Sequence, residues 1–277
     1  MRTALLSLLF FGSVLFAAST TCSGIYLNDD APDILNTKLL DKTKELCYSE
    51  FAVMHSGISR TPLWSAEHLT KEELSKKAKR SNKFHAEERL SPDERAELED
   101  YAHSGYDRGH MSPSADFTTK KSNIECFTLA NMVPQNHNNN TGIWSDIESA
   151  TREITKEDGE LYIITGPLFI GDNLKRIGAR VLVPTKLFKA IYIPSTRTAA
   201  AYLTDNAKGN AYRVISIAEL EKISGIDFFP MMSKKVKEHA AELLKPKAYH
   251  DKKPKNQDTD NFMDKIDKKV HNFYKGY

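Results

Sequence analysis

Residues 106–111 read Tyr-Asp-Arg-Gly-His-Met, and this run places a guanidinium and an imidazole two positions apart. The imidazole of His110 can take a proton from water near neutral pH. The guanidinium of Arg108 can bind two phosphate oxygens in a forked arrangement, and Gly109 permits the close approach of a backbone or a phosphate. Alone, so short a motif is weak evidence, because a single histidine is more often structural.

An asparagine-rich run follows at residues 129–142 and reads Leu-Ala-Asn-Met-Val-Pro-Gln-Asn-His-Asn-Asn-Asn-Thr-Gly. Its ordinary interpretation is a polar loop that caps the next helix. That helix is predicted to start near Thr141, because apolar residues recur at helical spacing from Ile143 to Ile154. Glu148 and Arg152 lie four residues apart on an adjacent stripe, where the ordinary interpretation is a surface ion pair worth a few tenths of a kcal/mol.

Outward from this stretch, the pattern predicts several strands and few long helices. Residues 36–48 have helical spacing, residues 70–97 are charge-rich and are expected to form exposed helix and loop, and residues 217–223 suggest a short helix. Short apolar runs predict strands at residues 50–55, 161–167, 181–184, 188–193 and 199–203. Because strands and helices do not alternate regularly, the fold class is predicted to be α+β.

The ends of the chain differ in composition from its middle. Residues 1–20 combine a basic start, a short apolar run and small residues, which predicts a signal peptide and a secreted protein, either periplasmic or extracellular. No later segment is apolar enough to cross a membrane, so no membrane association is expected after cleavage. Residues 246–277 are polar and Lys-rich and are expected to form a mobile tail, which leaves residues 21–245 as one domain.

The composition is that of an ordinary soluble globular protein. The 277 residues are 40% hydrophobic and 27% charged, with a formal net charge of +2, so the chain is not a histone-like polycation. It has three cysteines. Cys22 and Cys47 are the pair expected to form a disulfide in an oxidising compartment, and Cys126, in an apolar stretch, is expected to be a buried, inert thiol.

Taken together, these runs resemble the DNA/RNA non-specific endonuclease family, the Serratia-type secreted nucleases with a ββα-metal site. The family's Asp-Arg-Gly-His signature stands here at residues 107–110; Asn131 follows 21 residues beyond His110, and Asn140 follows nine residues later. Further blocks that look like the family's stand at Gly142, Trp144, Glu148, Arg152, residues 165–167, 183–185 with Lys189, and 225–230. The resemblance covers roughly residues 51–230 and implies a single α+β domain, with a central, mostly antiparallel sheet flanked by helices and the site on a strand–loop–helix unit over residues 106–154.

The resemblance also implies a role for each residue around the metal. His110 would be the general base that activates the attacking water. Asn131 would orient the imidazole through its other nitrogen, or support the loop that carries it. Asn140 would be the only direct protein ligand of a divalent metal, and Glu148 would hold the metal's water molecules.

Three arginines are implied to act on the phosphate. Arg108 and Arg152 would stabilise the charge of the pentacovalent phosphorane. A further arginine precedes the signature in the family, and Arg80 is the nearest candidate for it in this chain. The alternative for Arg80 is a solvated residue in a charge-rich loop.

The implied cofactor is one hydrated Mg²⁺, with Mn²⁺ as a substitute. Magnesium prefers hard oxygen ligands and often keeps several water molecules, and a neutral amide ligand leaves the ion its full charge to act on phosphate. A zinc site at His110 and His137 is the poorer alternative, because no third and fourth nitrogen or sulfur ligands are apparent.

The implied substrates are DNA and RNA, cleaved with little regard for sequence, since no zinc finger, basic zipper or recognition helix is present to read base edges. Two alternatives stay open: an RNA-preferring nuclease or nucleotide phosphodiesterase on the same fold, and a catalytically inactive nucleic-acid-binding protein. The resemblance leaves both a monomer and a homodimer open.

Overall fold

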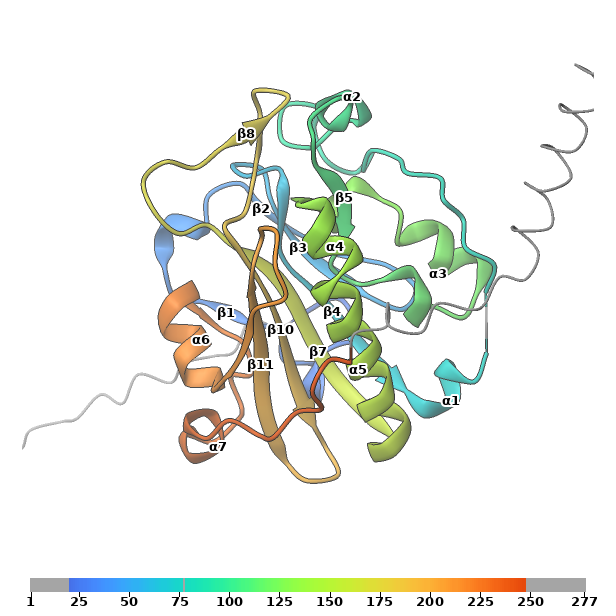
Figure 1. Ribbon diagram of the computed structural model, residues 1–277, viewed down its shortest axis with the longest axis vertical. Helices are drawn as coiled ribbons and strands as arrows, with labels where there is room; N and C mark the ends of the chain where they lie inside the picture. The colour runs from blue at the N-terminus through green and yellow to red at the C-terminus, as the bar shows by residue number, and fades with distance from the viewer. Residues whose placement is uncertain (1–19, 77, 248–277) are drawn as a thin grey trace, which may run out of the picture.

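The computed structural model describes residues 20–76 and 78–247. Its centre is a seven-stranded sheet in which every neighbouring pair is antiparallel (Figure 1). In spatial order the strands are β12 (Tyr212–Ile215), β11 (Thr198–Asp205), β10 (Lys186–Ile193), β7 (Glu160–Leu168), β4 (Thr61–Thr70), β3 (Ala52–Ser56) and β2 (Thr43–Cys47). The prediction of an α+β fold with a central antiparallel sheet is confirmed.

Short elements surround this sheet. The described residues contain three two-stranded sheets, formed by β1 (Asp33–Ile34) with β13 (Ile226–Asp227), β5 (Asp107–His110) with β6 (Met132–Gln135), and β8 (Arg176–Ile177) with β9 (Val181–Leu182). The α-helices are α1 (Lys71–Leu74), α2 (Leu98–Tyr101), α3 (Lys120–Glu125), α4 (His137–Thr141), α5 (Ile143–Asp158), α6 (Ile217–Ser224) and α7 (Lys234–Glu238). Single 3₁₀ turns are η1 (Leu27–Asp29), η2 (Thr37–Leu39), η3 (Ser114–Asp116) and η4 (Leu129–Asn131).

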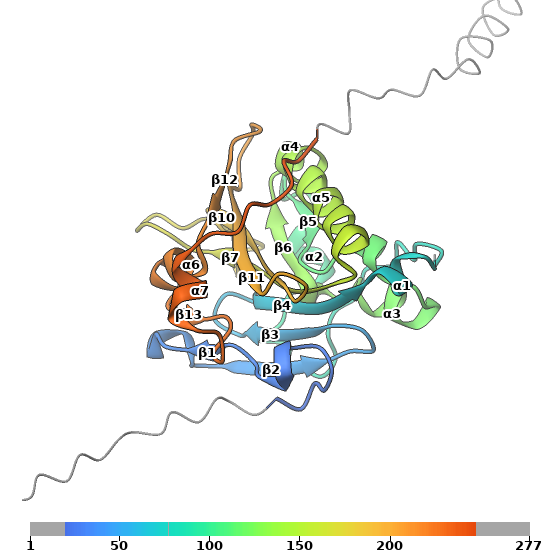
Figure 2. The ribbon, with the colours of Figure 1, turned by 90° about the horizontal axis from the view of Figure 1, so that it is seen from below.

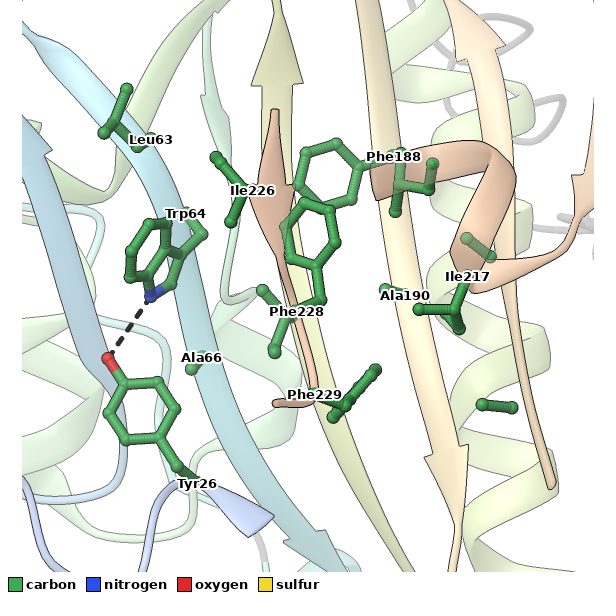
Figure 3. Close-up of a cluster of buried hydrophobic side chains, with 14 of the residues drawn as sticks. Tyr26, Leu63, Trp64, Ala66, Phe188, Ala190, Ile217, Ile226, Phe228 and Phe229 are labelled. Atoms are coloured by element: carbon green, nitrogen blue, oxygen red, sulfur yellow. Dashed lines mark hydrogen bonds between the residues drawn. The ribbon is translucent and has the colours of Figure 1, made fainter. Parts of the chain in front are cut away.

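Side chains that alternate along the central strands divide the core into two layers. On one face, Phe188 of β10 packs with Trp64 of β4 and with Phe228, beside α6 (Figure 3). On the other face, Leu187 of β10 packs with Trp144 and other apolar residues of α5. Figure 2 shows α5 on one side of the central strands and α6 and α7 on the other. Helix α5 therefore lies directly on the sheet, and this contact fixes the side chains that it carries.

The predicted helix over residues 36–48 is wrong. The segment forms only the 3₁₀ turn η2 and then the edge strand β2, which pairs with β3 from Thr43 opposite Ser56 to Cys47 opposite Ala52. Leu40, one of the residues that suggested a helical face, is 48% exposed and contributes nothing to the core. Tertiary pairing with β3 decides this segment, because a spacing pattern over so few apolar residues fits either structure.

The other local predictions fared better. Strands β3, β7, β10 and β11, helix α6 and the start of α5 lie where the sequence placed them, whereas the strand predicted at residues 181–184 is reduced to β9. The charge-rich segment over residues 70–97 has α1 followed by irregular chain, as expected, but it is not wholly exposed, because Leu90 and Ala96 are buried.

The cysteine predictions are confirmed. Cys22 and Cys47 form a disulfide that ties the N-terminal segment to β2. Cys126 is free and fully buried, and burial raises the pKa of its thiol to about 12, as expected for an inert cysteine. No helix in the described part of the chain is long and apolar enough to cross a membrane. Most of the segment predicted as a signal peptide, and most of the predicted tail, lie outside the described residues.

Candidate active site

Most of the functional candidates lie on a unit formed by β5, β6 and the helices α4 and α5 that follow. β5 pairs with β6 from Asp107 opposite Gln135 to His110 opposite Met132, and the chain then continues into α4 and α5. Gly109 is required for space, because a β-carbon there would lie 2.6 Å from the β-carbon of Gln135. The β5–β6 strand pair thus brings the Asp-Arg-Gly-His signature against the asparagine-rich run, in which Asn131 stands 21 residues after His110.

A polar cavity of about 330 Å³ opens at this unit. Five of the seven residues singled out from the sequence line it, although they come from the segment between α1 and α2, from β5, from α4 and from α5: Arg80, Arg108, His110, Asn140 and Glu148. The structure therefore places Arg80 with the others, although the sequence left its role open.

Two of the seven candidates do not line the cavity. Arg152 lies one turn beyond Glu148 on α5, and its Nη1 donates to Oδ1 of the buried Asp116 at 2.9 Å. Asn131 accepts a hydrogen bond from the backbone N–H of Ser112 at 3.0 Å and donates to the carbonyl of the same residue at 2.9 Å. Of the two roles left open for Asn131, its contacts match support of the loop that follows His110.

His110 is almost wholly enclosed. The residue is 8% exposed, and its Nε2 is buried without a hydrogen-bond partner in the described part of the chain. The edge of its ring faces Phe127, with centroids 4.8 Å apart. Burial, and to a smaller extent the positive charge of Arg80, lower the pKa of His110 to about 3. The imidazole is therefore neutral at neutral pH and has a free lone pair.

The orientation of Asn140 follows from its hydrogen bond. Its Nδ2 donates to Oδ2 of Asp107 at 2.9 Å, and the same carboxylate oxygen lies 2.9 Å from Nδ1 of His137. Because the amide nitrogen is engaged with Asp107, the amide oxygen is left to accept from, or to ligate, another group. The sequence marked Asp107 only as part of the signature and His137 only as an alternative zinc ligand, and it assigned a positioning role to neither.

The rest of the asparagine-rich run does cap the helix, as its ordinary interpretation held. Asn136 is the N-cap of α4, and its Oδ1 accepts from the backbone N–H groups of Asn138 and Asn139. Asn139 is itself buried, accepting from Nε2 of Gln135 at 2.7 Å and donating to the carbonyl of Asp205 at 2.9 Å. The run therefore has both roles, with the capping contacts fixing the backbone that presents Asn140.

The donors around the cavity fit a hard divalent cation. Glu148 makes no hydrogen bond or ion pair within the described residues, and burial raises its pKa to about 7. A cation near this carboxylate would offset the cost of burying its charge. One carboxylate and one free amide oxygen are the ligand type that Mg²⁺ prefers. The residues present therefore fit a hydrated magnesium ion.

Zinc does not fit this cavity. His137 is paired with Asp107, and its side chain is 68% exposed. Among the described residues, one group of three histidine, cysteine or acidic side chains is close enough to share an ion, and it consists of Cys22, Glu45 and Cys47. The two cysteines of that group form the disulfide, so they are not thiolate ligands.

Comparison with known proteins gives a family. The family model for the DNA/RNA non-specific endonuclease matches residues 33–235. The chain is 35% identical over 209 residues to the mitochondrial nuclease EXOG of Danio rerio, covering 68% of this chain and 61% of that protein. It is 33% identical over 218 residues to the Homo sapiens EXOG, covering 70% and 59%. The chain thus spans about three fifths of the length of these relatives.

A relative of lower sequence identity and a solved structure also match this chain. Mitochondrial endonuclease G of Bos taurus is 27% identical over 202 residues, covering 66% of this chain and 68% of that protein. A crystal structure of the EndoG/EndoGI complex, described as showing the mechanism of EndoG inhibition, superposes with a TM-score of 0.64 at 28% identity and covers 69% of this chain and 88% of that one.

These relatives contradict the prediction of a secreted protein, periplasmic or extracellular. The EXOG and endonuclease G relatives are named as mitochondrial. A basic start followed by an apolar run is weak evidence for export, since targeting segments for different compartments share basic and apolar residues.

The family model matches well over half of the chain, and the matched region contains every residue that lines the cavity. Members of this family typically depend on a divalent metal ion, which agrees with the oxygen donors that Asn140 and Glu148 supply. The chain belongs to the DNA/RNA non-specific endonuclease family, a family of nucleic-acid hydrolases.

Proposed function

We propose that this chain is an endonuclease that hydrolyses phosphodiester bonds in DNA and RNA with little regard for sequence, using a histidine general base and one hydrated Mg²⁺ held by Asn140. The observation that carries the proposal is the shared cavity, in which an imidazole, two guanidinium groups, an amide and a carboxylate meet. Each of these groups has a task in phosphodiester hydrolysis, and together they come from four separate parts of the chain.

His110 supplies the base. Its neutral imidazole accepts a proton from the attacking water. With a pKa near 3 in the free protein it is a weak base, but part of that depression comes from the charge of Arg80. A phosphate bound at Arg80 offsets this charge, so substrate binding itself raises the basicity of the imidazole.

The arginines bind the phosphate. Arg80 and Arg108 line the cavity and bind the non-bridging oxygens of the phosphate, where their charge stabilises the pentacovalent transition state. Arg152, paired with the buried Asp116, does not line the cavity, but its positive charge lowers the pKa of Glu148 and so favours the charged carboxylate.

Asn140 and Glu148 hold the metal. The amide oxygen of Asn140 would be the direct ligand, and Glu148 would accept hydrogen bonds from the metal's water molecules. When bound, Mg²⁺ supplies Lewis-acid stabilisation of the charge on the phosphate and on the leaving oxygen. Mn²⁺ accepts the same oxygen donors.

Cleavage with little sequence preference follows from the groups in the cavity. The charged side chains that line it address phosphate, and phosphate contacts carry no sequence information. Binding should therefore weaken steeply as salt concentration rises.

The test is cleavage of plasmid DNA and of RNA by the purified protein, with Mg²⁺ or with EDTA, beside His110→Ala and Asn140→Ala. We expect magnesium-dependent degradation to short fragments, lost in both variants while their thermal unfolding curves stay close to that of the parent. Cleavage in EDTA would remove the role of Asn140, and equal cleavage by His110→Ala would remove the role of the imidazole. Binding without cleavage under any divalent metal would instead identify a nucleic-acid-binding protein.

A further inference from the structure

Two phenylalanine rings contact the ring of His110, and the face of each also contacts the guanidinium of one arginine of the cavity. The guanidinium carbon of Arg108 lies 4.2 Å from the ring centroid of Phe84, and that of Arg80 lies 5.0 Å from the centroid of Phe127. The two rings meet edge to face with centroids 4.9 Å apart, and Phe84 is also 5.7 Å from the ring of His110. The base and both arginines therefore share one aromatic wall.

This wall holds the arginines without neutralising them. Neither Arg80 nor Arg108 forms an ion pair with a carboxylate in the described part of the chain, and Nε of Arg80 donates at 2.6 Å to the neutral amide of Asn82. Arg152, by contrast, is paired with Asp116. A carboxylate would fix a guanidinium but would also compete with phosphate for its charge. The face of an aromatic ring attracts the cation and leaves its full charge and its N–H donors available.

The backbone segment that carries Phe84 is hydrogen-bonded to neighbouring parts of the chain. The N–H of His85 donates to the carbonyl of Phe127 at 3.2 Å, and the N–H of Leu129 donates to the carbonyl of His85 at 2.8 Å. Earlier in the same loop, the N–H of Ser81 donates to the side chain of Asn123 at 2.8 Å. The segment that carries Phe84 is thus tied to the chain that leads into β6, which fixes its backbone, and the contacts of its ring with Phe127 and His110 restrict the side chain.

From this geometry we propose that Phe84 is a positioning residue for Arg108, holding its guanidinium at the cavity wall where the scissile phosphate binds. The proposal deepens the function proposed above and rests on it. Phe127 serves Arg80 in the same way, but it is fully buried in the core, so its removal would also disturb packing. Phe84 is only partly buried, so changing it should disturb the core less than changing Phe127 would.

The experiment is a double-mutant cycle on kcat/KM with Phe84→Leu and Arg108→Gln. Phe84→Leu should lower kcat/KM about three- to thirtyfold, the range that one desolvated cation–π contact contributes, and Phe84→Tyr should restore most of it because the ring face returns. In the Arg108→Gln background, Phe84→Leu should cost almost nothing further.

A matched control removes an equivalent contact outside the cavity. The guanidinium of Arg89 lies 4.4 Å from the ring centroid of Tyr48, and neither residue lines the cavity. Tyr48→Leu should lower the unfolding temperature but leave kcat/KM per folded molecule unchanged. A loss of kcat/KM in this control comparable to that of Phe84→Leu would mean that the effect reports general destabilisation, and the proposal would fail.

Two outcomes overturn the role of Phe84 while leaving the nuclease proposal intact: an unchanged kcat/KM in Phe84→Leu, or the same loss with and without Arg108. Failure of the parent to cleave would instead overturn the nuclease proposal. In that case the same cycle, run in EDTA on the Kd for a fluorescein-labelled oligonucleotide, still tests the positioning of Arg108. We expect Phe84→Leu to weaken binding there only when Arg108 is present.

Discussion

Gly109→Ala should lower both the stability and the cleavage activity of the protein, because the β5–β6 strand pair has no space for one more carbon. Gly109 is not in the left-handed region, so its requirement is steric. The added β-carbon would lie 2.6 Å from the β-carbon of Gln135, an atom close to the backbone that a change of rotamer cannot remove. The β5–β6 pair must therefore separate, or Gln135 must leave its place.

The magnitude has two parts. Overpacking a well-filled site costs about 1–3 kcal/mol. Displacing Gln135 also breaks its 2.7 Å hydrogen bond to the buried Asn139, and leaving a buried amide unpaired costs about 1–3 kcal/mol. The free energy of unfolding should fall by about 2–6 kcal/mol, a large share of the ~5–15 kcal/mol that a domain has. Because β5 also carries Arg108 and His110, a shift of about 1 Å should lower cleavage about a hundredfold per folded molecule.

Urea unfolding followed by circular dichroism measures the first effect, and plasmid cleavage at saturating Mg²⁺ measures the second. Gly105→Ala is the matched control, since Gly105 has a φ of +77° and no atom within 4 Å of an added β-carbon. It should cost about 1–2 kcal/mol of backbone strain and leave cleavage per folded molecule unchanged. The reasoning is refuted if Gly109→Ala is no less stable than Gly105→Ala and cleaves at the parent rate.

Three further predictions follow from the site and its surroundings. Since burial raises the pKa of Glu148 to about 7, Mg²⁺ must displace a proton from this carboxyl group below that pH. The half-saturating Mg²⁺ concentration for cleavage should therefore fall up to tenfold per pH unit as pH rises toward 7 and level off above it. A Mg²⁺ titration of cleavage should show that this pH dependence is lost in Glu148→Gln. Asp116→Ala leaves the guanidinium of Arg152 without its 2.9 Å partner, so urea unfolding should show a loss of about 3–5 kcal/mol, and an unchanged midpoint would contradict the pairing. Cys47→Ser opens the disulfide to Cys22, which closes a separation of 25 residues, so the free energy of unfolding should fall by about 3 kcal/mol with kcat/KM unaffected because the bond is remote from the cavity.

Most of the sheet could be predicted because its central strands are buried on both faces. β7, β10 and β11 are short, nearly continuous apolar runs between turn residues, and such runs carry their own signal. β2 carries none, because it is a half-exposed edge strand whose pairing with β3 decides its structure. The helix predicted there shows that spacing alone cannot separate the two structures over so few apolar residues.

The candidate residues that line the cavity could be singled out from the sequence, most of them within residues 108–148, whereas the residues that contact them could not. His110, Asn140 and Glu148 follow one another within a single strand–strand–helix unit, so their spacing is fixed by local structure. Asp116 and Phe84 come from loops whose course depends on the whole fold, and neither stands in a pattern. Sequence could therefore indicate which groups are candidates to act on phosphate, but the groups that contact them became visible only in three dimensions.

The core beneath α5 shows the same division between stability and function. Thr165 of β7 lies in register between Ser65 of β4 and Lys189 of β10, and all three side chains are fully buried. Glu67, two residues after Ser65 and so on the same face, is also buried, with Oε1 3.8 Å from Nζ of Lys189.

Neither carboxylate oxygen of Glu67 has a hydrogen-bond partner in the described structure, and burial raises the pKa of this group. Such a pair is often no more stabilising than apolar residues of the same volume, and the opposite face of the sheet is filled by Trp64, Phe188 and Phe228. These buried polar groups therefore lie on the face of the sheet covered by α5, the helix of Glu148 and Arg152. The charge of Lys189 lowers the pKa of Glu148, and the charge of Glu67 raises the pKa of Arg152. A core chosen for stability alone would be apolar here too, so we expect these buried polar groups to serve the electrostatics of the candidate site.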